Sequence, residues 1–189
     1  MASLKPSGIL DMLKQILKYG LIAGLIVGIP LFGLTVGMKD HPPEAWGMAV
    51  GYLTMLIAFT TIFVAIKRLR DVDRGGVIGF WPALGLGLGI SFVASIFYVV
   101  AWEAAIAVSG VNFADFFTNM MIEQEKAKGV SAEVLAKFTA EMEQFRIQYA
   151  NPLYRLPMTF TEIFPVGLLV SVISAGLLRN KNFLALKRR

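Results

Sequence analysis

Two carboxylates lie within long apolar stretches of the sequence, where a charged group is energetically costly and is a candidate for function by default. Glu162 is about five residues into the last stretch, and Glu103 lies near the end of the stretch before it. Pro165 has no N–H to bond the carbonyl of Thr161, so a free carbonyl, a hydroxyl and a carboxylate come close together. Such a group can coordinate a cation or relay a proton.

The same residues have a simpler interpretation. Glu103 follows Trp102, an expected interface anchor, and Glu162 is expected at a similar depth, so the two can approach each other. Arg155 and Tyr98 are the candidate partners for this pair. In the simpler interpretation, Glu162 is a shallow carboxylate that water or Arg155 satisfies, without any functional role.

A second concentration of chemistry-bearing residues lies in the connection at residues 67–76. The aspartates Asp71 and Asp73 have the spacing of a metal-binding pair in some nucleotide-sugar enzymes, but no nucleotide-binding pattern surrounds them. Neighbouring cations would neutralise both carboxylates, so we expect a surface charge cluster. Its basic residues are also candidates for holding anionic lipid headgroups. These residues are Lys67, Arg68, Arg70 and Arg74.

Other catalytic residue types are scarce. The chain has no cysteine and a single histidine, His41, which we expect in a solvated turn. A thiolate nucleophile, a cysteine metal site and a serine–histidine triad are therefore not expected. We predict a protein that is not an enzyme and that uses no metal ion and no cofactor.

Small residues recur at four-residue spacing within the apolar stretches. This spacing places them on one face of a helix and lets two helix backbones approach closely in lipid. We expect them to pack helices within one chain, with association of two copies through the first span as the alternative. The candidate packing residues are Gly20, Gly24, Gly28, Gly85, Gly89, Gly167 and Ser171.

The overall composition explains why these residues must be positioned by membrane helices. The chain has 189 residues, of which 56% are hydrophobic and 16% charged, and its mean hydropathy is +0.65. Soluble domains are about 45–50% apolar and about 25% charged. The net charge is +5, and the basic residues lie beside the apolar stretches. They do not form a basic surface interleaved with aromatic residues that could stack on bases, so nucleic-acid binding is excluded.

Four apolar stretches are long enough to cross about 30 Å of hydrocarbon as helices. They cover approximately residues 19–36, 46–66, 80–108 and 157–178. Twelve of the 18 Lys and Arg residues lie in residues 1–18, 67–76 and 179–189, on one side of the predicted membrane. The positive-inside rule therefore places both termini in the cytoplasm.

The remaining segments complete the predicted organisation. Residues 1–18 form an amphipathic segment that either lies in the membrane interface or simply leads into the first span. Residues 19–108 hold three spans, residues 157–178 the fourth, and residues 179–189 a basic tail. Between them, residues 109–156 predict a periplasmic helical hairpin: Asn112 and Ser131 start its two helices, Gly129 follows the first, and Asn151-Pro152 ends the second.

The sequence also resembles a known family. The residues that carry the resemblance are Arg70-Asp71 and then Gly75-Gly76-Val77-Ile78-Gly79-Phe80, followed by a tyrosine-containing span, an acidic and methionine-rich insert, an Asn-Pro and a last span with a basic end. Over residues 21–181 this pattern is similar to the bacterial membrane family named domain of unknown function 4199, which usually has serine in place of Gly79. The resemblance implies a bacterial inner-membrane protein with four helices, and it carries over neither an activity nor a site.

Together these observations predict an all-α integral membrane four-helix bundle in the inner membrane, with its hairpin outside. We expect a non-enzymatic assembly, accessory or scaffold role. The alternative is a small transporter or channel subunit that uses Glu103 and Glu162 within an oligomer. The expected partners are the lipid bilayer and either further copies of the chain or another membrane protein.

Overall fold

The computed structural model describes residues 6–37 and 45–185, and within them the chain is helical without a strand. Residues 1–5, His41 with its neighbours, and residues 186–189 lie outside this description. Six α-helices and one short π-helix follow one another along the chain. They are α1 (Pro6–Gly37), α2 (Ala45–Arg68), η1 (Leu69–Asp73), α3 (Phe80–Ser109), α4 (Phe113–Ala127), α5 (Ala132–Tyr149) and α6 (Pro152–Leu178).

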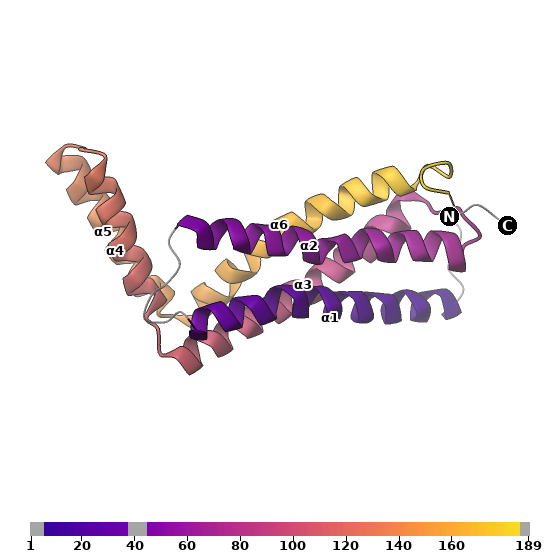
Figure 1. Ribbon diagram of the computed structural model, residues 1–189, viewed down its shortest axis with the longest axis horizontal. Helices are drawn as coiled ribbons and strands as arrows, with labels where there is room; N and C mark the ends of the chain where they lie inside the picture. The colour runs from indigo at the N-terminus through magenta and orange to yellow at the C-terminus, as the bar shows by residue number, and fades with distance from the viewer. Residues whose placement is uncertain (1–5, 38–44, 186–189) are drawn as a thin grey trace.

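Four of these helices are long and apolar enough to cross a membrane: they include the segments Leu10–Gly37, Ala49–Asp73, Phe80–Ser109 and Pro152–Leu178. The chain is therefore a multi-pass membrane protein. The start of α1, the π-helix η1 and the end of α6 lie at one end of the long helices (Figure 1). The end of α1, the start of α2, and the α4–α5 pair lie at the opposite end.

The helix α1 runs without a break from Pro6 to Gly37, so residues 6–18 continue the first span in the same direction. Met12 and Ile16 pack against the buried core of the long helices, whereas Leu10, Leu13 and Leu17 are exposed. The part of the N-terminal segment that the structure describes thus forms one continuous helix with the first span, and one side of it packs on the protein.

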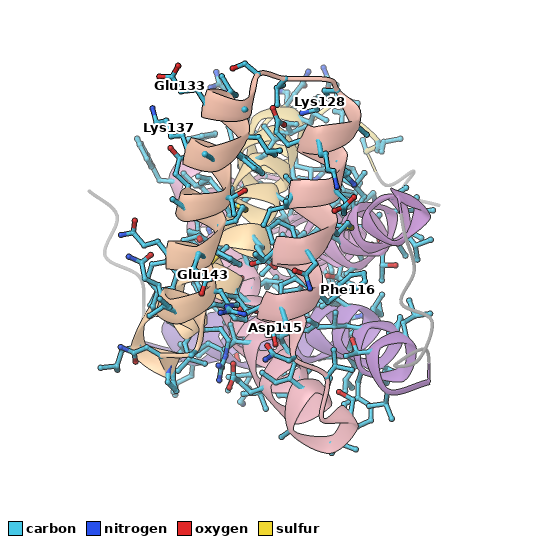
Figure 2. All side chains as sticks on the ribbon, turned by 90° about the vertical axis from the view of Figure 1, so that its left-hand side faces the viewer. Asp115, Phe116, Lys128, Glu133, Lys137 and Glu143 are labelled. Carbon is cyan, nitrogen blue, oxygen red and sulfur yellow. The ribbon has the colours of Figure 1, made fainter. Side chains whose placement is uncertain are left out.

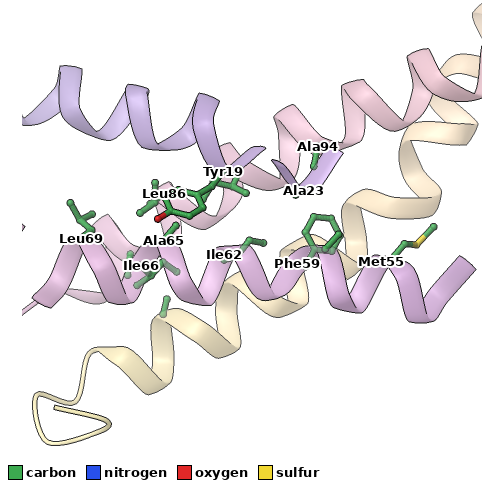
Figure 3. Packing of buried hydrophobic residues seen from close by; sticks show 14 of the residues in the cluster. Tyr19, Ala23, Met55, Phe59, Ile62, Ala65, Ile66, Leu69, Leu86 and Ala94 are labelled. Atoms are coloured by element: carbon green, nitrogen blue, oxygen red, sulfur yellow. The ribbon is translucent and has the colours of Figure 1, made fainter. Parts of the chain in front are cut away.

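The four long helices share one apolar core. Helix α1 contacts α2 and α3, and α6 contacts α2 and α3. Phe59 and Ile62 of α2 and Leu86 of α3 are fully buried in this core, and Tyr19 and Ala23 of α1 lie beside them (Figure 3). Most of the remaining large apolar side chains are exposed, as expected of helices whose outer surface contacts lipid rather than water.

Helices α4 and α5 pack side by side as an αα-hairpin that projects from the end of the long helices (Figure 1). The side chain of Asn112 accepts a hydrogen bond from the N–H of Asp115, and Ser131 accepts one from Val134. Gly129 between the helices has a φ of +70°. Both predicted helix starts and the predicted turn glycine are therefore used as capping rules require.

The fourth span starts earlier than its sequence predicts. Helix α6 begins at Pro152 instead of residue 157, and Pro157 lies inside it. Asn151 ends the hairpin and at the same time caps α6, because its side chain accepts the N–H of Leu153. The first residue of a helix has no intrahelical acceptor for its N–H, so a proline there loses no hydrogen bond. The Asn-Pro pair can therefore end α5 and start α6 almost at once.

Candidate functional site

The glycines of α1 lie directly against α3. A Cβ built on Gly24 would be 2.5 Å from the Cβ of Phe97, and one built on Gly20 would be 2.6 Å from the Cβ of Val93. A Cβ built on Gly28 would be 3.1 Å from the Cβ of Ala101. Each step of four residues along α1 is thus matched by a step of four residues forward along α3, so the two helices run parallel. This glycine face of the first span is therefore occupied within the chain.

The small residues of α3 and α6 meet in the same way, with the two helices antiparallel. A Cβ on Gly87 would lie 2.7 Å from the Oγ of Ser171, and one on Gly167 would lie 2.6 Å from the Oγ of Ser91. The hydroxyls of Ser91 and Ser171 are 3.3 Å apart, and both residues are fully buried. Gly167 and Ser171 thus pack against α3 in a close contact that larger side chains would prevent.

The two glycines of the predicted α3 pair have different surroundings. Gly89 lies against Ile16 of α1, with a built Cβ 2.6 Å from the nearest side-chain carbon. A Cβ built on Gly85 would be 4.0 Å from its nearest neighbour, the Cε of Met12, so an added methyl group would fit there.

Glu103 forms a two-pronged ion pair with the start of α6. The Nε and Nη2 atoms of Arg155 donate to the two carboxylate oxygens at 2.7 and 2.6 Å, and Nη1 donates to the carbonyl of Tyr149 at 3.2 Å. The side chains of Arg155 and Glu103 are 14% and 29% exposed, so the pair is largely shielded. This geometry ties α3, α5 and α6 together, because parallel N–H···O bonds fix the orientation of both groups.

Glu162 has a different partner at a different level. Tyr98 donates to its Oε2 at 3.4 Å, and Glu162 itself is exposed on the surface of the helices. Arg155 and Glu162 are seven residues apart on α6, which is about 10 Å along the helix axis. The structure therefore gives the two carboxylates separate partners instead of bringing them into one site.

The other two residues of the predicted ion or proton site, Thr161 and Pro165, do not join the carboxylates in one site. Thr161 is exposed and its hydroxyl donates to the carbonyl of Met158 at 2.8 Å, while Pro165 is exposed on α6. Thr159, two residues before Thr161 on α6 and not predicted as part of this site, is 1% exposed.

The basic connection departs most from its predicted role. Arg70 is fully buried, and its Nη atoms donate to the carbonyls of Phe183 and Leu184 at 2.8 and 3.1 Å. Longer contacts reach the carbonyls of Leu178 and Asn180. The expectation of Arg70 as a headgroup-binding residue is therefore corrected, because its guanidinium is buried and binds backbone carbonyls of the segment that follows α6.

The remaining basic residues of this connection lie closer to the surface. Asp71 accepts from the Nε of Arg70 and from Lys67, each at 2.6 Å, so both cations are used inside the cluster. Arg68 is exposed and Arg74 is half-buried. Among the described residues, no group of three His, Cys, Asp or Glu side chains is placed to hold a metal ion.

An aromatic cluster at the base of the hairpin was not predicted as a unit. The Nε1 of Trp102 donates to the hydroxyl of Tyr149 at 2.8 Å, and the ring of Trp102 meets the edge of Phe113 at 4.9 Å between centroids. Phe117 and Phe145 extend the contacts along α4 and α5. The apolar stripes of the two helices were visible in the sequence, but their joint contact with Trp102 depends on the way the chain turns after α3.

Comparison with known proteins identifies the family of the chain. The family model described as a protein of unknown function (DUF4199) matches residues 18–180, which is most of the chain. Neither a curated protein nor a solved structure matches the chain. The matched region begins within α1 and ends just after α6, so it includes the later part of α1, the other three long helices and the hairpin. The chain therefore belongs to the DUF4199 family.

Proposed function

We propose that this protein is a non-enzymatic accessory or scaffold protein of the bacterial inner membrane, in which a four-helix bundle presents the α4–α5 hairpin to the periplasm. The observation that carries the proposal is the firm attachment of the hairpin to the spans. Trp102, Tyr149 and Phe113 form one contact, and the Arg155–Glu103 pair adds a second at the same place. A projecting element held in a fixed orientation suits recognition of a partner.

The internal use of the small-residue faces supports the same role. Gly20, Gly24 and Gly28 contact α3 of the same chain, so this face of α1 is already used within one copy. The polar outer surface of the hairpin remains available, and Glu133 and Lys137 point away from α4 (Figure 2). A partner protein is therefore better accommodated on the hairpin than on the glycine face.

The proposed orientation rests on the distribution of basic residues. The start of α1, the basic connection and the end of α6 lie at the same end of the long helices (Figure 1), and twelve of the 18 Lys and Arg residues lie in the corresponding segments. Under the positive-inside rule this end is cytoplasmic. Cysteine at Lys126 or Gln144 should react with an impermeant thiol reagent from the periplasm, and cysteine at Arg74 or Asn182 should not. The reverse pattern would reject the orientation.

The accessory role is tested by exchanging two charges on the hairpin. The double change Glu133→Lys with Lys137→Glu retains the net charge and the i,i+4 pair, but reverses the pattern that a partner would meet. We expect it to fail to complement a deletion strain while its melting temperature stays within a few degrees of wild type. The matched control is Glu162→Gln, which changes a charge in the spans away from the attachment of the hairpin and should complement fully. Complementation by the hairpin variant would contradict the accessory role.

One observation favours a transporter or channel subunit as a second candidate. Glu162 accepts a hydrogen bond from Tyr98 within the span, and the hydroxyl-bearing Thr159 is buried on the same helix. A carboxylate and hydroxyls inside a membrane are typical of proton and cation paths. This candidate predicts that Glu162→Gln folds normally but abolishes complementation, and that Glu103→Gln weakens it. Full complementation by the double variant would exclude it.

A further inference from the structure

A cavity of about 320 Å³ lies at the base of the hairpin, where the end of α3, the start of α4, the end of α5 and the start of α6 meet. Two arginines from different helices, Arg146 and Arg155, line it together with Asp115 of α4. Apolar lining comes from Ile106 of α3 and Ile147 of α5. The cavity therefore combines cations and an apolar surface in one place, apart from the contact of Tyr98 with Glu162.

Both arginines keep donors for a ligand. A guanidinium carries five N–H bonds, and the bonds of Arg155 to Glu103 and to the carbonyl of Tyr149 use three of them. Arg146 donates one N–H from each of its two Nη atoms, to Asp115 and Glu143, which leaves three N–H bonds, including that of Nε. Planar guanidinium groups with spare donors are well suited to bind phosphate oxygens.

The position of the cavity relative to the spans indicates the kind of phosphate. Trp102 and the half-exposed Tyr154 lie at the same end of the spans, and such residues are typical of the membrane–water interface. Ile147, which lines the cavity, is 67% exposed, and Leu153, near the start of α6, is 83% exposed, so large apolar side chains accompany the two arginines at this end of the spans. An amphipathic rim of this kind matches the boundary between acyl chains and headgroups.

We propose that this cavity binds the phosphate of a phospholipid from the leaflet next to the hairpin. Arg146 and Arg155 bind the phosphate oxygens, and the exposed apolar side chains contact the adjoining acyl chains. Asp115 competes with the phosphate for Arg146, because its carboxylate already accepts a hydrogen bond from that guanidinium. The inference depends on the four membrane spans and not on the orientation of the chain or on the accessory role.

Native mass spectrometry of the whole protein in detergent, with added phosphatidylglycerol or phosphatidylethanolamine, tests the proposal. Arg146→Gln should lower the affinity for each lipid about tenfold, since it removes the charge from a charge-assisted contact. Lys137→Gln, which removes a charge from the same helix away from the cavity, should bind lipid as wild type does. Asp115→Asn should bind at least as well as wild type, because it releases Arg146. Equal lipid affinity of Arg146→Gln and wild type would overturn the proposal.

Two further arms distinguish other outcomes. Inorganic phosphate at millimolar concentration should not displace the lipid; displacement would show a site for a soluble anion and overturn the lipid proposal. Ala150→Phe places a large side chain in the cavity without changing any charge, because Ala150 is part of its lining. This variant should also lose lipid at an unchanged melting temperature. Retention of lipid by Ala150→Phe would overturn the proposal even if Arg146→Gln failed to fold.

Discussion

Replacement of Gly24 by alanine tests the contact between α1 and α3 most directly. The added Cβ would lie 2.5 Å from the Cβ of Phe97, whereas non-bonded carbon atoms prefer about 3.5–4.0 Å. Because the Cβ of Phe97 is fixed to the backbone, a change of side-chain rotamer cannot relieve the contact, and the helices must separate. Overpacking of this kind costs about 1–3 kcal/mol.

The matched control is Gly33→Ala on the same helix. No atom lies within 4 Å of a Cβ built on Gly33, so this change has only the gain in helix propensity, about 1 kcal/mol. Gly24→Ala has the same gain, and the difference between the two variants therefore isolates the packing cost. At about 2–4 °C per kcal/mol for a chain of this size, Gly24→Ala should melt roughly 2–12 °C below Gly33→Ala in the same detergent.

The result that would refute this reasoning is a melting temperature of Gly24→Ala equal to or above that of Gly33→Ala. It would mean that α3 does not occupy the glycine face in the membrane. Chemical cross-linking of the two variants gives an independent measurement. If the glycine face joined two copies, Gly24→Ala would reduce the dimer yield without lowering the melting temperature, contrary to our expectation.

Three further predictions concern polar groups. Arg70→Met should destabilise the protein by about 3–5 kcal/mol, because it leaves Asp71 and several carbonyls without their buried donor; faster tryptic cleavage after Lys181 would report the loosened tail, and an unchanged rate would contradict it. The Glu103–Arg155 pair should show a coupling of about 0.5–3 kcal/mol in a double-mutant cycle of the two Gln variants, and additive effects would argue against a direct pair. Burial raises the pKa of Tyr149 to about 12, so its contribution to stability is present below pH 10 and is lost as the pH rises towards 12. The Tyr149→Phe variant should therefore lose less stability than wild type over that interval, which alkaline denaturation would measure.

The elements that local rules govern could be predicted from the sequence. Asn112 and Ser131 cap the hairpin helices because short polar side chains satisfy the first free N–H groups, and this preference is visible without tertiary contacts. The start of α6 was predicted five residues too late, because here the local signal has two meanings. Asn151-Pro152 reads equally as the end of one helix and as the cap of the next, and only the direction of the chain distinguishes them.

The polar contacts between helices could be predicted only in part. Arg155 and Tyr98 were expected near Glu103 and Glu162, but which carboxylate each would bind depends on the rotation of α6 about its axis. Arg70 could not be assigned, since its acceptors are backbone carbonyls more than a hundred positions later in the chain. Every residue type has a backbone carbonyl, so the sequence does not show which residues will accept hydrogen bonds from Arg70. From the sequence alone, a buried arginine in a charged connection therefore looks the same as an exposed one.

The position of Arg70 has a consequence for biosynthesis. The arginine leaves the ribosome with the second span, whereas the carbonyls that it binds belong to the last residues of the described chain. Until α6 has been inserted, the guanidinium has no acceptors there, so the first three spans cannot reach their final arrangement at that end. Domains generally fold as units during synthesis, starting from the N-terminus. In this protein a contact that can form only after α6 has been synthesised completes the assembly, and a chain truncated before α6 should be cleared by membrane proteases instead of accumulating.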